Sequence, residues 1–169
     1  MSENKEVKFW WSYLYTEDEL LSSLKRFTND STTTWICRFV FLLGNLLLFA
    51  AFLDIEPLWR IVLFFTMWTS FLTIEYFFLL AMIYYLGKRA SNSLLAIHHM
   101  LFSITLVYNI IVVVIYWPLL YKLDLEKPHM QASQYRRWLH RLIHSWPLFT
   151  VVGNFYISDI TMKPNQGYI

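Results

Sequence analysis

Two pairs of histidines are the residues whose spacing most directly suggests chemistry in this chain. His140 and His144 stand one helical turn apart, and neutral imidazoles at that spacing can bind one metal ion together. The sequence offers no obvious third ligand, so we do not expect a metal site. A membrane haem would need histidines on two helices at matching depth, whereas His98 and His144 are expected near opposite faces of the membrane. We therefore expect no cofactor.

One carboxylic acid, Glu75, lies near the centre of an apolar run at residues 59–86. As a helix, these 28 residues would span about 42 Å, which exceeds the roughly 30 Å apolar core of a bilayer. An acid at that depth is costly unless it is protonated, paired or turned toward other helices. Glu75 is therefore predicted to be functional or structurally paired.

Three hydroxyl residues of the same run share one helical face. Thr66, Ser70 and Thr73 follow each other at spacings of four and three. Small hydroxyl side chains let helices approach closely in lipid, so this face is predicted to meet another helix. Glu75 lies about 200° round the helix from Thr73, so these two residues do not form a ready-made catalytic pair.

The composition indicates the elements that hold these residues. Hydrophobic residues make up 57% of the chain, aromatic residues 20% and charged residues 15%, and the mean hydropathy is +0.40. Such values are typical of a membrane protein. We predict an all-α, polytopic membrane fold with four transmembrane helices, at residues 35–53, 59–86, 97–120 and 142–157. The fourth is the weakest, because Pro147, Gly153 and Asn154 interrupt it, and it could start earlier, near Tyr135.

The N-terminal segment is predicted to add an amphipathic helix that lies on the membrane. Thr16 and Glu19 form a capping box, and the apolar residues that follow, up to Phe27, fall on one face. Docking of this face onto a protein partner is an equally good explanation. The chain then divides into a polar N-terminus at residues 1–34, a four-helix domain at residues 35–160 and a polar tail at residues 161–169.

Polar residues also occur inside and between the predicted spans. Asn45, Asn109 and Asn154 lie within them. Because Asn45 follows Gly44, it is expected to mark close helix packing rather than chemistry. The segment before the fourth span is basic and could attract anionic lipid headgroups. Its cations are Lys127, Arg136, Arg137 and Arg141.

Composition also excludes several function classes. With four glycines and no glycine-rich phosphate loop, the chain is not expected to bind nucleotides. The single cysteine, Cys37, cannot form an intrachain disulfide. A net charge of +2 predicts no nucleic-acid partner.

Residues 68–80, with Phe71-Leu72-Thr73, resemble a span of the androgen-induced-protein family of multi-pass membrane threonine hydrolases. Further matches bring the resemblance to residues 68–162, without the family's C-terminal membrane helices. They are Tyr116-Trp117, Tyr121-Lys122-Leu123-Asp124, and Trp138-Leu139 followed by His144. The resemblance implies that Thr73 is a nucleophile and His144 its general base, and that the pair cleaves lipid esters within the membrane.

Two functions are therefore expected as alternatives. In the first, which we favour, the chain is a non-catalytic accessory subunit that packs into a larger membrane complex, with membrane lipids and other subunits as partners. A respiratory or energy-converting complex of the mitochondrial inner membrane is expected, with the endoplasmic reticulum or plasma membrane as alternatives. In the second, the chain is an intramembrane lipid-ester hydrolase that uses Thr73 and His144.

Overall fold

The computed structural model describes residues 16, 18, 31–56 and 64–158. Helices account for nearly all of this part of the chain, and no strand occurs in it. The predicted all-α fold is confirmed to that extent. Apart from Thr16 and Asp18, the surface helix predicted to begin at Thr16 lies outside the described residues, as does the tail at residues 161–169.

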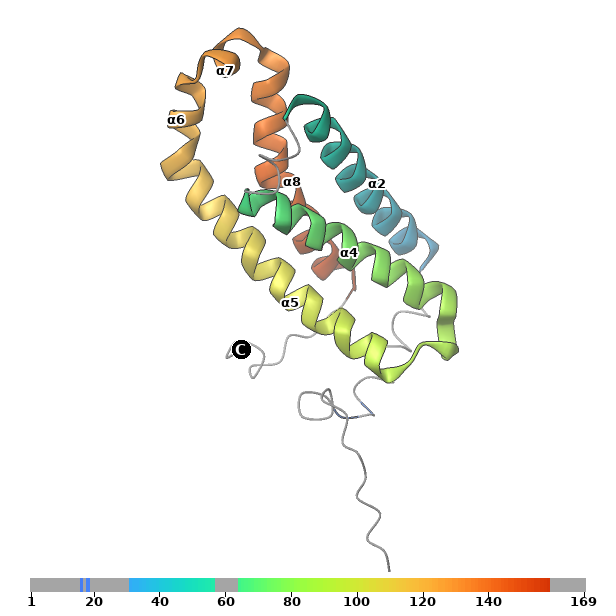
Figure 1. Ribbon diagram of the computed structural model, residues 1–169. Helices are drawn as coiled ribbons and strands as arrows, with labels where there is room; N and C mark the ends of the chain where they lie inside the picture. The colour runs from blue at the N-terminus through green and yellow to red at the C-terminus, as the bar shows by residue number, and fades with distance from the viewer. Residues whose placement is uncertain (1–15, 17, 19–30, 57–63, 159–169) are drawn as a thin grey trace, which may run out of the picture.

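Four long helices form a bundle (Figure 1): α2 (Thr32–Ile55), α4 (Phe65–Leu86), α5 (Asn92–Ile115) and α8 (Gln134–Ser158). Each packs against the next in chain order, α8 closes the bundle against α2, and α4 also touches α8. The 3-10 turn η2 (Gly87–Arg89) joins α4 to α5. Beyond α5, the chain continues through a π-helical turn, η3 (Tyr116–Leu120), then α6 (Tyr121–Glu126) and α7 (Pro128–Ala132), before α8.

Three stretches among the described residues are long and apolar enough to cross a membrane. They are residues 32–55, 65–86 and 92–126, and they coincide with the first three predicted spans. The second helix is shorter than predicted at its start, because Phe64 is extended and α4 begins at Phe65. Residues 57–63 lie outside the described part.

The fourth helix starts where the alternative prediction placed it. α8 begins at Gln134, one residue before Tyr135 and eight residues before the start at residue 142 that its apolar run had favoured. The apolar run begins late because three arginines lie in the first turns of the helix. Pro147 lies inside α8 without ending it, since a proline removes only one backbone donor and packed neighbours can compensate in a bundle. α8 is not among the three membrane-spanning candidates.

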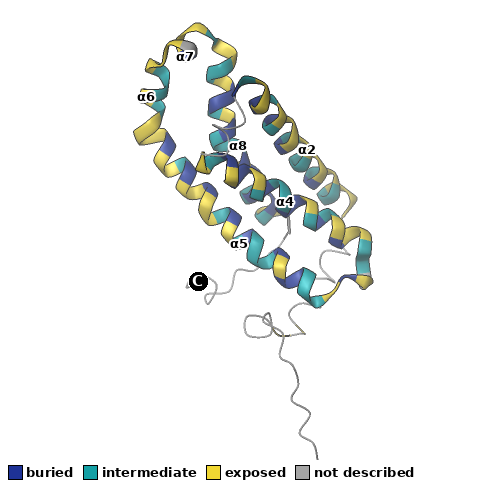
Figure 2. Ribbon diagram, in the orientation of Figure 1, coloured by how far each residue is buried: buried dark blue, intermediate teal, exposed yellow. Residues whose placement is uncertain are grey.

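α8 buries several polar side chains and exposes several large apolar ones. His140, Thr150 and Asn154 are buried against the other helices. The exposed large side chains include Tyr135, Trp138, Leu142, Phe149 and Tyr156. Figure 2 shows exposed residues in the same way along the outer side of α5. An outward apolar face is expected where the surroundings are lipid rather than water.

The bundle interior is held together by polar contacts and close packing. Asn45 Nδ2 donates to Thr150 Oγ1 at 3.0 Å, and Arg38 Nε donates to Asn154 Oδ1 at 3.0 Å. Gly44 lies so close to Trp146 that an added Cβ would meet its ring at 2.9 Å. The prediction that Gly44 and Asn45 mark close helix packing is confirmed.

Candidate functional site

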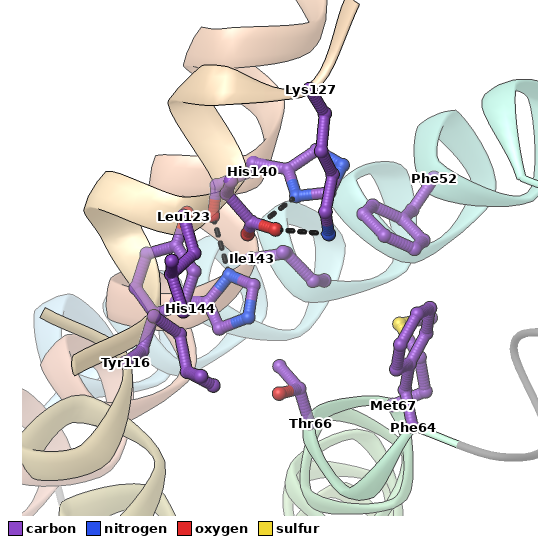
Figure 3. A pocket seen from close by; sticks show the side chains of 12 residues that line it. Phe52, Phe64, Thr66, Met67, Tyr116, Leu123, Lys127, His140, Ile143 and His144 are labelled. Atoms are coloured by element: carbon purple, nitrogen blue, oxygen red, sulfur yellow. Dashed lines mark hydrogen bonds and ion pairs between the residues drawn. The ribbon is translucent and has the colours of Figure 1, made fainter. Parts of the chain in front are cut away.

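A cavity of about 370 Å³ lies at the end of the bundle where α2 and α5 end and α4 and α8 begin (Figure 3). We call it the end pocket. One part of its lining is apolar: Phe52, Phe64, Met67, Leu120, Leu123 and Ile143. The other part is polar: Thr66, Tyr116, Asp124, Lys127, His140 and His144. A small cavity with an apolar wall and a few convergent polar groups is the usual form of a ligand site.

The π-helical turn η3 positions Tyr116 in this pocket. Pro118 cannot donate a backbone hydrogen bond, and the Tyr121 N–H instead reaches the Tyr116 carbonyl. Single π turns occur frequently at functional sites. Here the turn buries the Tyr116 side chain, and its ring stacks on His144 with 3.5 Å between centroids.

The hydrogen bond of His144 fixes which of its ring nitrogens carries a proton. Nδ1 lies 2.6 Å from the His140 carbonyl oxygen, and a carbonyl can only accept, so Nδ1 must donate. In a neutral imidazole the other nitrogen, Nε2, is then an acceptor. Figure 3 shows this nitrogen pointing across the pocket toward Thr66. His144 therefore presents an acceptor to any ligand in the end pocket.

The charges around the pocket are paired with one another. Asp124 accepts from Lys127 and lies 3.7 Å from His140 Nδ1. Glu56, buried at the end of α2, lies 3.9 Å from Arg136 and 4.0 Å from His140. These contacts tie α2, α6 and α8 together at the pocket end and leave the polar wall close to neutral.

The four cations predicted to contact lipid headgroups all engage groups of the protein. Lys127 and Arg136 lie in the ion pairs just described. Arg137 donates to the carbonyl oxygens of Met130 and Gln131, at 2.9 and 3.0 Å. Arg141 lies over the rings of Tyr121 and Trp138. Headgroup binding by these residues stays a prediction.

Thr73 is placed away from the end pocket. Its hydroxyl donates to the Thr69 carbonyl at 2.8 Å and accepts from Asn109 Nδ2 at 3.0 Å, and the residue is fully buried. Within the described residues, no hydrogen bond joins Thr73 to His144. The structure confirms that the hydroxyl face of this helix meets another helix, because Asn109 belongs to α5. Thr66, two turns earlier on α4, is the hydroxyl that reaches the pocket.

The histidines are also separated. The His98 ring stacks on the Tyr76 ring, with 5.0 Å between centroids. His98 lies on α5, 18 residues before Tyr116. This separation corresponds to about 27 Å of helix. Because His144 stacks on Tyr116, His98 and His144 lie at different depths, as the sequence predicted. Among the described residues, no group of three or more potential ligands is placed to hold a metal ion.

Glu75 lies on the outer face of α4. Five exposed residues share this side of the helix with it, each three or four residues from the next member of the series: Trp68, Phe71, Phe78, Met82 and Tyr85. We call these five residues together with Glu75 the α4 stripe. Glu75 itself is half-buried, and in the described part of the chain it has neither a hydrogen bond nor an ion pair. The predicted pairing of Glu75 is therefore not provided by the other described residues.

Sequence reasoning missed the roles of Thr66, Tyr116, Asp124 and Glu56 at the end pocket. One local signal was present, since Pro118 inside an apolar span indicates an irregular turn. The ion pairs of Asp124 and Glu56 with α8 gave no signal, because their partners are distant in the sequence.

Comparisons of this chain with protein-family models, with curated proteins and with solved structures find no match. The resemblance to the androgen-induced-protein family therefore stays a prediction.

Proposed function

We propose that this chain is an accessory subunit of a larger membrane complex and that the α4 stripe is the surface that contacts its partner. The observation that carries the proposal is the position of Glu75. It follows Phe65, the first residue of the 22-residue helix α4, by about 15 Å, so it lies near the middle of a membrane-spanning helix. A carboxyl group facing hydrocarbon there is costly, and a partner helix that covers it would remove that cost.

Charge complementarity defines the partner. In a two-fold dimer built on the α4 stripe, Glu75 of one copy would face Glu75 of the other, and this arrangement is unfavourable for two carboxylates. The partner is therefore a different chain, with a transmembrane helix that carries a Lys or Arg side chain at the depth of Glu75. The aromatic residues on either side of Glu75 provide the apolar contact area for such a helix.

The proposal includes α8 as a fourth membrane-spanning helix. Its inward polar residues lower its average hydropathy, while Trp138, Leu142 and Phe149 present an apolar face outward. A helix of 25 residues is about 37 Å long, which is enough to cross the bilayer beside the other three.

Site-specific photo-crosslinking in native membranes tests the interface. A photoreactive amino acid is placed at Phe78, on the α4 stripe, and as a control at Val114, an exposed residue of α5. We expect the Phe78 label to join one other membrane protein, at a transmembrane helix with a Lys or Arg within one turn of the joined residue. The adduct should be lost when Glu75→Leu is added.

Three results would overturn the proposal. They are a Phe78 label that joins only lipid, one that joins this chain's own N-terminal residues, and an adduct that persists unchanged with Glu75→Leu. A label that joins a second copy of the chain would exclude the heterologous partner.

The geometry gives less support to the alternative, a lipid-ester hydrolase. A nucleophile must lie within hydrogen-bond reach of its base, and the Thr73 hydroxyl is instead bound to Thr69 and Asn109. His144 faces the end pocket and Thr66. A Thr73 and His144 dyad would require α4 to move relative to α8 by about two helical turns.

A further inference from the structure

The end pocket has the chemistry of a site for one particular class of membrane lipid. We propose that it binds an uncharged amphiphile with a hydroxyl head, such as a monoacylglycerol, with the head between His144 and Thr66. This site is separate from the α4 stripe, and the inference does not depend on the subunit role.

The hydrogen-bonding groups select a ligand that can donate. His144 Nδ1 is occupied by the His140 carbonyl, so a neutral His144 offers the pocket only an acceptor, Nε2. A hydroxyl can donate to this nitrogen and at the same time accept from the Thr66 hydroxyl. A carboxylate or a fully ionised phosphate can only accept, and it would leave Nε2 unpaired.

The charges of the pocket disfavour an anionic head. Lys127 is the one Lys or Arg that lines the cavity among the described residues, and it is paired with Asp124. Arg136, just outside, is paired with Glu56. An added anion would therefore meet the Asp124 carboxylate, whose cation is already engaged, while an uncharged head disturbs neither pair.

The size and apolar wall of the pocket select an amphiphile. A volume of about 370 Å³ is at the lower end of the range for small-molecule sites. It accommodates a small head and the first part of an acyl chain. Phe52, Met67 and Ile143 line the pocket with apolar surface for that chain, and Met67 and Ile143 are buried in the bundle.

Competition photolabelling of the full chain in phosphatidylcholine nanodiscs tests the inference. The probe is 1-oleoylglycerol with a photoreactive group in its acyl chain, and the competitors are unlabelled 1-oleoylglycerol, oleate and 1-oleoyl lysophosphatidate. We expect 1-oleoylglycerol to compete at a concentration about tenfold lower than oleate, a ratio that corresponds to roughly one hydrogen bond, and at a lower concentration than lysophosphatidate, whose phosphate would add an anion beside Asp124. Labelled peptides should come from the start of α4 and from α8.

Variants locate the site. Thr66→Val removes one hydrogen bond and should weaken binding by about two- to tenfold. His144→Lys replaces the acceptor with a cation and should shift the preference toward oleate. Thr73→Val, on the same face of α4 but outside the pocket, is the matched control and should leave binding unchanged.

The experiment tests the ligand class and the location of the site separately. Oleate competing as well as 1-oleoylglycerol would overturn the ligand class. Equal effects of Thr66→Val and Thr73→Val, or labelled peptides only from the outer face of α5, would overturn the site. Because the labelled peptides are identified in the unaltered chain, the test holds even if a variant fails to fold.

Discussion

At the scale of single residues, the role of a side chain in this protein depends on the groups that it contacts. Thr66 and Thr73 share a helix face, yet one lines the end pocket and the other is bound to Asn109 of α5. Hydrogen bonds of this kind between transmembrane helices are worth about 0.6 kcal/mol on average. In the structure, Thr73 therefore contributes to the packing of α4 against α5. A catalytic role for Thr73 stays a prediction that rests on the family resemblance.

Gly44 gives a prediction about stability. Because a Cβ there would meet the Trp146 ring at 2.9 Å, Gly44→Ala should force α2 and α8 apart and destabilise the protein by about 1–3 kcal/mol. The measurement is the melting temperature of the detergent-purified protein. Combining Gly44→Ala with Trp146→Phe should restore part of the loss, because the smaller ring leaves room for the methyl group. An unchanged melting temperature for Gly44→Ala would show that this contact is loose.

At the scale of elements, α8 combines polar and apolar residues whose contributions to its mean hydropathy cancel. Its arginines and histidines lie in the same 25 residues as its exposed aromatic residues, so the mean hides both its buried polar side chains and its exposed apolar ones. Their separation appears only when the helix is placed against α2 and α5.

The position of α8 in the membrane can be tested with single cysteines. In a Cys37→Ser background, cysteines at Arg89, Ala132 and Ile157 are labelled with a membrane-impermeant maleimide in sealed vesicles. If α8 crosses the membrane, Ile157→Cys should react from the same side as Arg89→Cys, and Ala132→Cys from the other side. Reaction of Ala132→Cys and Ile157→Cys from one common side would show that α8 does not cross.

At the scale of the whole molecule, the described bundle buries several polar groups beside its apolar core and exposes many large apolar side chains. Arg38, Asn109 and Asn154 are buried, whereas exposed large hydrophobic residues cover all four long helices. Three helices suited to crossing a membrane support an integral membrane protein. Residence in the mitochondrial inner membrane stays a prediction.

The subunit proposal predicts the size of the particle. After mild detergent extraction, the chain should migrate with a larger complex in native electrophoresis, because Glu75 requires a partner within the membrane. Glu75→Leu should release it, whereas Val114→Ala on α5 should not. Migration of the unaltered chain as a monomer would contradict the proposal. Comigration with a complex of the mitochondrial inner membrane would support that compartment.

The sequence by itself determined the helical class, three of the spans and the position of an acid within the second. These features follow from local properties, namely the length of apolar runs and the 3.6-residue period of a helix. Even the close packing at Gly44 could be predicted, because a small residue beside Asn45 has few other uses in a membrane helix.

Only the tertiary structure decided which side chains meet. The end pocket joins Thr66 of α4, Tyr116 of η3 and His144 of α8, and the position of Glu75 on an outer face depends on how α4 is rotated against α2 and α5. Both depend on contacts between residues distant in the chain, and helix rotation and depth are set by packing rather than by local composition. For the same reason the sequence could suggest Thr73 and His144 as partners, whereas the packing of α4, α5 and α8 places Thr73 beside Asn109.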